Sequence, residues 1–197
     1  MHLDLGSFAS VRSFTNQIKA LNRPVAVLVN NANNISHRSE MSPDGYEKLV
    51  QVNFLSTALL SLLIRPLMIE GGRIIFSTSL SHTPVSIPYE FPAVSNFMPI
   101  AAYAQSKMAL SLFSIYLSTV LRTQHVAVNS VDSGLVNLSK LGMNRFISRF
   151  RFISNHTGNL ENGAKAMMRA IGSADPGFIF KSGKQQIKAS SMPRHTR

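Results

Sequence analysis

Apolar residues follow a helical period in some stretches of the chain and form continuous runs in others. Residues 8–21 carry apolar side chains at helical spacing, and Ser7 before them suits an N-cap. Residues 25–29 read Val-Ala-Val-Leu-Val, a run typical of a strand that is buried on both faces of a parallel sheet. Residues 73–79 and 125–131 form similar runs and predict two more strands.

Helical segments are expected between these strands. One runs from about residue 46 to 68, where Gly71 and Gly72 are expected to stop it, and another runs from about 101 to 122. Strands that alternate with helices predict an α/β fold, a Rossmann-like parallel sheet with helices on both faces. Shorter predicted pieces are a strand end at 3–5, a loop at 80–100, helices at 141–152 and 160–171, and a strand at 178–180.

The length of 197 residues favours one domain, which we expect over residues 1–183, followed by a basic, disordered tail over 184–197. The chain contains no Cys, which excludes disulfides and thiolate metal sites, and its six His have no metal-ligand spacing. The first residues do not resemble a signal peptide, so the expected location is cytoplasmic.

The net charge of +11 lies mostly in the last third of the chain. Residues 1–139 hold nine Lys or Arg and seven Asp or Glu, a net charge of +2, whereas residues 140–197 hold eleven and two, a net charge of +9. Such asymmetry favours either an anionic partner or a solvated basic edge. No aromatic or glycine-rich nucleic-acid motif accompanies the charge, so we expect no specific nucleic-acid partner, and peripheral membrane contact stays open.

Candidate chemistry gathers where the predicted strands end, at 30–33, 77–79 and 132–134. Ligands bind at the carboxyl ends of the strands in such sheets. Tyr103 and Lys107 lie four residues apart on the predicted helix, which puts them on one face, one turn apart. An ammonium beside a phenol lowers the phenol pKa, so this pair is a candidate general acid and base. The alternative is an exposed Tyr and Lys on a solvated helix face.

Five motifs in order resemble the short-chain dehydrogenase/reductase family. Asn30-Asn31-Ala32 resembles its Asn-Asn-Ala-Gly turn, residues 52–54 the helix with its catalytic Asn, and 73–79 the strand that leads to its catalytic Ser. Tyr103-Ala-Gln-Ser-Lys107 matches Tyr-x-x-x-Lys, and 128–134 resembles the strand that ends in Pro-Gly. The 24-residue step from Ser79 to Tyr103 resembles the retinol-dehydrogenase-like and WW-domain-oxidoreductase-like branch.

The resemblance implies an NAD(P)-dependent oxidoreductase that interconverts an alcohol and a carbonyl. Tyr103 would exchange the proton, Lys107 would lower its pKa and bind the nicotinamide ribose, Ser79 would donate to the substrate oxygen, and Asn53 would hold a water in a relay to Lys107. The implied residues for NAD or NADP are Asp4, Asn30, Ala32, Tyr103, Lys107, Gly134 and Val136. A lipophilic substrate and a homo-oligomer formed by the helices at 46–68 and 101–122 are also expected.

The sequence departs from the family pattern around the cofactor. It contains no Thr-Gly-x-x-x-Gly-x-Gly loop, it begins at what would be the end of the third strand, and it has Asn33, Ser133 and Leu138 where the family has Gly, Pro and Thr. We therefore expect an N-terminally truncated Rossmann-type domain. The alternative function is that of a catalytically inactive homologue that acts by binding.

Overall fold

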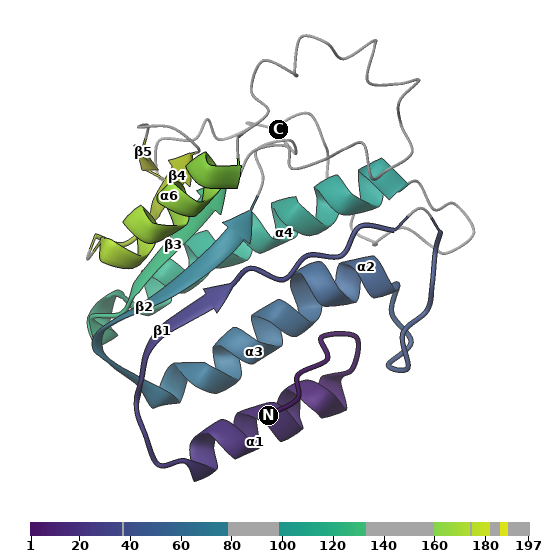
Figure 1. Ribbon diagram of the computed structural model, residues 1–197, viewed down its shortest axis with the longest axis horizontal. Helices are drawn as coiled ribbons and strands as arrows, with labels where there is room; N and C mark the ends of the chain where they lie inside the picture. The colour runs from purple at the N-terminus through teal and green to yellow at the C-terminus, as the bar shows by residue number, and fades with distance from the viewer. Residues whose placement is uncertain (37, 79–98, 133–159, 174, 182–185, 189–197) are drawn as a thin grey trace, which may run out of the picture.

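A computed structural model of the chain describes residues 1–36, 38–78, 99–132, 160–173, 175–181 and 186–188. Its centre is a sheet in the order β1-β2-β3-β4-β5 (Figure 1). The strands β1 (Val25–Asn30), β2 (Met68–Thr78), β3 (Ala127–Asp132) and β4 (Phe178–Lys181) pair in parallel. This arrangement confirms the predicted Rossmann-like α/β fold.

Helices cover both faces of the sheet, as predicted. Successive β2 residues point to opposite faces, so Ile74 and Phe76 pack against α4 (Pro99–Val120), whereas Ile75 packs against α6 (Leu160–Gly172). The helices α3 (Ser56–Ile64) and α1 (Phe8–Ala20) form further layers beside β1, with Val11 buried between them (Figure 1). The predicted cap is confirmed, since Ser7 accepts a hydrogen bond from the Ser10 amide.

Strand β1 is an edge strand, and the prediction that both its faces are buried is wrong. Leu28 packs into the core under α3, but Val27 and Val29 are 37% and 39% exposed. The reason lies in the coverage of the other face, because α6 packs over β2, β3 and β4 but does not reach β1. Burial of an apolar run thus depends on its neighbours in the sheet.

The predicted helix over 46–68 is present but irregular. It consists of α2 (Lys48–Val50), a π-helical turn η1 (Gln51–Leu55), α3, and a 3₁₀ turn η2 (Arg65–Leu67). The stretch Lys48–Leu67 is long and apolar enough to cross a membrane by length and composition, yet half of its most apolar window is buried within the fold. A core helix meets the same criterion, so this stretch is weak support for a membrane span.

The expectation that Gly71 and Gly72 stop this helix is wrong. The helix ends at η2, which contains Pro66, and both glycines lie inside β2. Gly71 has a φ of +72°, and a Cβ on Gly72 would lie 2.8 Å from the carbonyl oxygen of Ile69. These two positions need glycine because β2 shifts register against β1 there.

Two predictions at the ends of the chain also need correction. Residues 3–5 form no strand; instead, the Gly6 amide donates to Asp4 Oδ1 at 2.7 Å in a local turn. Residues 186–188, expected to lie in a disordered tail, form β5 (Gln186–Lys188), which pairs antiparallel with β4. The predicted helix at 141–152 and nearly all of the predicted loop at 80–100 lie outside the described residues.

Candidate active site

Helix α4 carries Tyr103 and Lys107 past the carboxyl ends of β2 and β3. Leu110 and Leu117 hold the helix against the sheet, in the core cluster that contains Ile74 and Phe76. Small residues near Tyr103, such as Ala102 and Ala104, are buried and let the helix approach its neighbours closely. The helix therefore fixes the place of both side chains, which project one turn apart as predicted.

The Lys107 ammonium is buried and faces the sheet. The side chain is 1% exposed, and Nζ donates to the carbonyl oxygen of Ser77, at the end of β2, over 2.8 Å. Nζ also lies 5.9 Å from the centroid of the Tyr103 ring. Burial lowers the Lys107 pKa from 10.5 to about 8, because the charged form loses its hydration.

The Tyr103 hydroxyl accepts a hydrogen bond from Asn33 Nδ2 at 3.3 Å. The pKa of Tyr103 is raised above 10.0, first by burial, while the Asn33 bond lowers it and the Asp132 carboxylate raises it. The net shift of the Tyr103 pKa is thus upward, opposite to the lowering predicted from the neighbouring Lys107 ammonium. The Lys107 ammonium lies over the ring and donates to a backbone carbonyl, so burial of the phenol dominates.

Asn53 ties the loop after β1 to α4. Its Oδ1 accepts from the Asn34 amide at 2.7 Å, and its Nδ2 donates to the Asn34 carbonyl at 2.9 Å and to Ser106 Oγ at 3.2 Å. Ser106 Oγ in turn donates to the Tyr103 carbonyl at 2.7 Å. The sequence predicted a role for Asn53 but not the contacts that Asn34, Ser106 and Asn33 make in this site. For Asn33 alone there was a signal, because it stands where the family has Gly.

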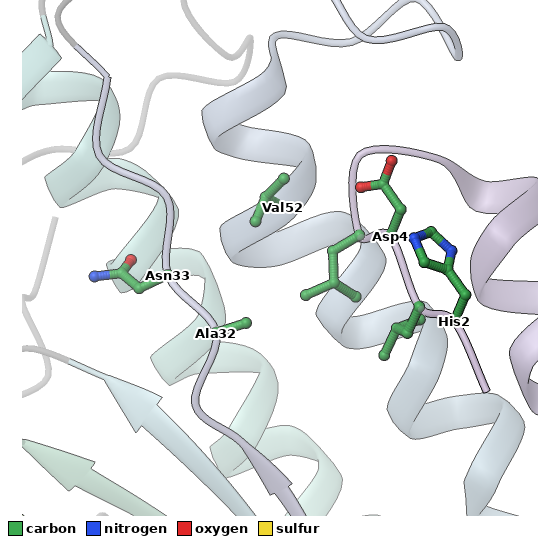
Figure 2. A pocket seen from close by; sticks show the side chains of 7 residues that line it. His2, Asp4, Ala32, Asn33 and Val52 are labelled. Carbon is green, nitrogen blue, oxygen red and sulfur yellow. The ribbon is translucent and has the colours of Figure 1, made fainter.

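A pocket of about 380 Å³ lies on the other side of the same loop (Figure 2). Its lining includes the predicted cofactor residues Asp4 and Ala32, along with His2, Leu3, Leu5, Asn33 and Val52. The predicted residue Asn30 does not line it; its side chain is buried and donates to Ser61 Oγ at 3.1 Å. The structure thus separates Asn30 from Asp4 and Ala32.

The remaining predicted site residues, Ser79, Gly134 and Val136, lie outside the described residues, as do Ser133 and Leu138. Among the described residues, no group of three or more His, Asp or Glu is placed to hold a metal ion. The described part of the site therefore consists of Tyr103, Lys107, Asn53 and Asn33, with the pocket beside them.

Comparison with known proteins places the chain in a family. The family model described as short chain dehydrogenase matches residues 1–148. Mouse (Mus musculus) polyprenol dehydrogenase is 37% identical over 144 residues, which cover 68% of this chain and 43% of that protein. Human (Homo sapiens) retinol dehydrogenase 13 is 34% identical over 161 residues, which cover 80% of this chain and 48% of that protein.

The chain spans less than half the length of these two relatives. Among solved structures, a blue fluorescent protein from a metagenomic library, in complex with NADPH, aligns with a TM-score of 0.53 and 26% identity over 67% of this chain and 50% of that one. With the family model on three quarters of the sequence, the chain belongs to the short-chain dehydrogenase family, in its retinol-dehydrogenase-like branch.

Proposed function

We propose that the protein is an NAD(P)-dependent oxidoreductase that interconverts an alcohol and a carbonyl, with Tyr103 as the general acid and base. The observation that carries this proposal is the placement of Tyr103 and Lys107. The phenol of Tyr103 accepts a hydrogen bond from Asn33, and the buried ammonium of Lys107 lies one turn further along the same helix. A positioned proton donor beside a buried cation suits proton exchange with a substrate oxygen.

The pocket at Asp4 and Ala32 supports binding of the adenosine part of NAD or NADP. It is open, lies beside the carboxyl end of β1, and carries a carboxylate that can accept hydrogen bonds from a base or a ribose. The residues proposed to hold the remainder of the cofactor are Lys107, Gly134 and Val136. When bound, the nicotinamide supplies or accepts the hydride.

In the proposed mechanism the chain moves a proton and stabilises charge. Tyr103 Oη gives its proton to a carbonyl oxygen during reduction and takes it back during oxidation. The Lys107 ammonium, 5.9 Å from the centre of the ring, is proposed to stabilise the phenolate that is left behind, against the burial that raises the Tyr103 pKa. Ser79 is proposed to donate a hydrogen bond to the substrate oxygen, and Asn53 to order a water in the path to Lys107.

A lipophilic alcohol or its carbonyl is the proposed substrate class. The relatives' names, polyprenol dehydrogenase and retinol dehydrogenase, refer to alcohols of this kind. The stretch 85–97 contains apolar residues that suit the wall of such a pocket. A cytoplasmic location and a homo-oligomer belong to the same proposal, and peripheral membrane contact is left open.

The test is to replace Tyr103 by Phe in a form of the protein that carries a family phosphate loop before residue 1. Turnover of retinol or a prenol with NAD⁺ or NADP⁺ should fall by at least about 100-fold, the usual contribution of a general acid and base. Cofactor affinity should change little, since the ring is kept. The matched control is Tyr116→Phe on the same helix, because Tyr116 is 63% exposed. Activity within tenfold of the parent would remove Tyr103 from its role.

The second candidate function is that of a binding protein without catalysis. Two observations favour it: Asn33 stands where the family has Gly, and Lys107 Nζ donates to the Ser77 carbonyl. Failure of the parent protein with the phosphate loop to turn over any alcohol or aldehyde, while it still binds NADH, would favour this candidate.

A further inference from the structure

Asn33 connects the loop after β1 to the phenol of Tyr103. The two residues are 70 positions apart in the sequence, and Asn33 Nδ2 lies 3.3 Å from Tyr103 Oη. Figure 2 shows the Asn33 side chain pointing away from Asp4 and His2, which lie on the far side of the pocket. A glycine, which the family pattern has at this position, has no side chain with which to make this contact.

The loop is held in place by the residue that follows. Asn53 bonds both the amide and the carbonyl of Asn34, at 2.7 Å and 2.9 Å, and Asn53 is only 1% exposed. Through Ser106 the same side chain is linked to the backbone of Tyr103. The loop and α4 are thus joined by a closed set of hydrogen bonds, which sets the position of Asn33 relative to the phenol.

We propose that Asn33 is a positioning residue for Tyr103: its side-chain amide donates to the phenol oxygen and leaves the phenol proton free to point at a bound oxygen atom. The role in turnover rests on the proposed function, whereas the contact itself does not. A phenol hydroxyl can donate one hydrogen bond and accept another at its oxygen. Because Asn33 occupies an acceptor site, the O–H is available to a carbonyl oxygen in the site.

The electrostatics of the site agree with this geometry. A donor to the phenol oxygen stabilises the phenolate more than the neutral phenol. The Asn33 bond accordingly lowers the Tyr103 pKa, whereas burial and the Asp132 carboxylate raise it. The Lys107 ammonium faces the same ring from the next turn of α4. Asn33 therefore supplies a polar contact that opposes the effect of burial.

The experiment is a ¹⁹F NMR titration of the full chain with 3,5-difluorotyrosine incorporated at position 103. Fluorine lowers the phenol pKa, so the titration falls at a milder pH, and a single label needs no assignment. Asn33→Leu should raise the pKa by about one unit, which corresponds to the loss of one hydrogen bond to a charged group. Asn33→Asp should raise it further, because a carboxylate would face the phenolate. The matched control is Asn31→Leu, an exposed position of the same loop, which should leave the pKa unchanged.

A pKa in Asn33→Leu within about 0.2 unit of the parent, or below it, would overturn the proposal. If Asn33→Leu does not fold, Asn33→Gly decides by the same criterion, because it restores the family's residue and removes the side chain that carries the amide. The measurement needs no cofactor, substrate or turnover. Its failure is therefore distinguishable from failure of the proposed function, which is judged by the activity of Tyr103→Phe.

Discussion

The ammonium of Lys107 lies 5.9 Å from the centre of the Tyr103 ring and bonds to the Ser77 carbonyl at 2.8 Å. The cation therefore faces the aromatic ring and the end of β2. Burial holds its pKa near 8, so the charge is retained at neutral pH at a cost to folding. This relationship leads to a stability effect that can be measured without any ligand.

Stability is expected to rise with pH through the titration of Lys107. Below pH 8 the folded protein must bury the charged form, whereas between about 8 and 10.5 the unfolded chain binds a proton that the folded protein has released. The free energy of unfolding of the parent, relative to Lys107→Met, should increase by about 2–3 kcal/mol between about pH 7 and pH 10. Denaturant unfolding of both proteins at several pH values measures it. A difference that stays flat or falls over this range would contradict the buried placement of the ammonium.

Asn53 is expected to contribute to stability through its three hydrogen bonds. Asn53→Ala leaves the Asn34 amide and carbonyl and the Ser106 hydroxyl without this partner, and should cost about 2–4 kcal/mol of unfolding free energy. The matched control is Asn34→Ala, because Asn34 contributes only its backbone to this pair of bonds. Equal effects of the two substitutions would argue that Asn53 does not join the loop to α4.

The long strands and helices were predictable because their apolar side chains repeat at the period of the element and are buried. The helix with Tyr103 and Lys107 is confirmed for this reason. The exposure of Val27 was not predictable, since it depends on where α6 ends. Strand β5 is polar in sequence and owes its conformation to pairing with β4. Local sequence patterns do not encode such long-range relationships.

The same limit applies to the candidate site. Motifs located Tyr103, Lys107 and Asn53, because these residue types recur at set places in the family pattern. The contact between Asn33 and Tyr103 joins residues 70 positions apart, and no period in the sequence specifies it. Asn53 lies in a π-helical turn, which the helical period of the sequence does not predict, and such turns often occur at functional sites. The pKa of Tyr103 depends on burial, which the spacing of Tyr and Lys does not reveal.

The outer face of α4 is expected to associate with a second copy of the chain. On the two helices predicted to form the interface, Leu59 and Leu63 pack toward α1 instead, whereas Leu112 and Tyr116 are 55% and 63% exposed. Light scattering at roughly 10 µM should show an oligomer for the parent and a monomer for Tyr116→Lys, because a charge at the centre of an apolar interface is costly to bury.

The exposed edge of β1 is the alternative surface through which two copies could associate, and a substitution there serves as the control. Val29 is 39% exposed on an edge strand, and a lysine is a natural means of preventing edge-to-edge pairing. Val29→Lys should leave an oligomer formed by α4 intact. If Val29→Lys is monomeric while Tyr116→Lys stays oligomeric, the interface lies at the β1 edge and not at α4. If the parent is itself a monodisperse monomer, neither surface forms an interface under these conditions.

The 197-residue chain is expected to bind nicotinamide dinucleotides weakly. Their pyrophosphate normally rests on a glycine-rich turn at a helix N-terminus, and these 197 residues contain no Thr-Gly-x-x-x-Gly-x-Gly sequence. The pocket at Asp4 and Ala32 is proposed to contact the adenosine part of the cofactor and not its pyrophosphate. We expect isothermal titration with NADH and NADPH to give no binding tighter than about 1 mM, or roughly −4 kcal/mol.

Adenosine itself should bind the same pocket at millimolar concentration. Its addition should shift the NMR signals of Ala32 and Val52, which line the pocket. Asp4→Asn should weaken adenosine binding several-fold while the fold is retained, because the new amide oxygen can still accept the hydrogen bond from the Gly6 amide. Equal affinity of the parent and Asp4→Asn for adenosine would mean that the carboxylate does not contribute to the pocket.

The NADH titration has its own contradicting outcome. A dissociation constant for NADH in the low micromolar range, about −8 kcal/mol, would mean that the described residues hold the pyrophosphate without a glycine-rich loop.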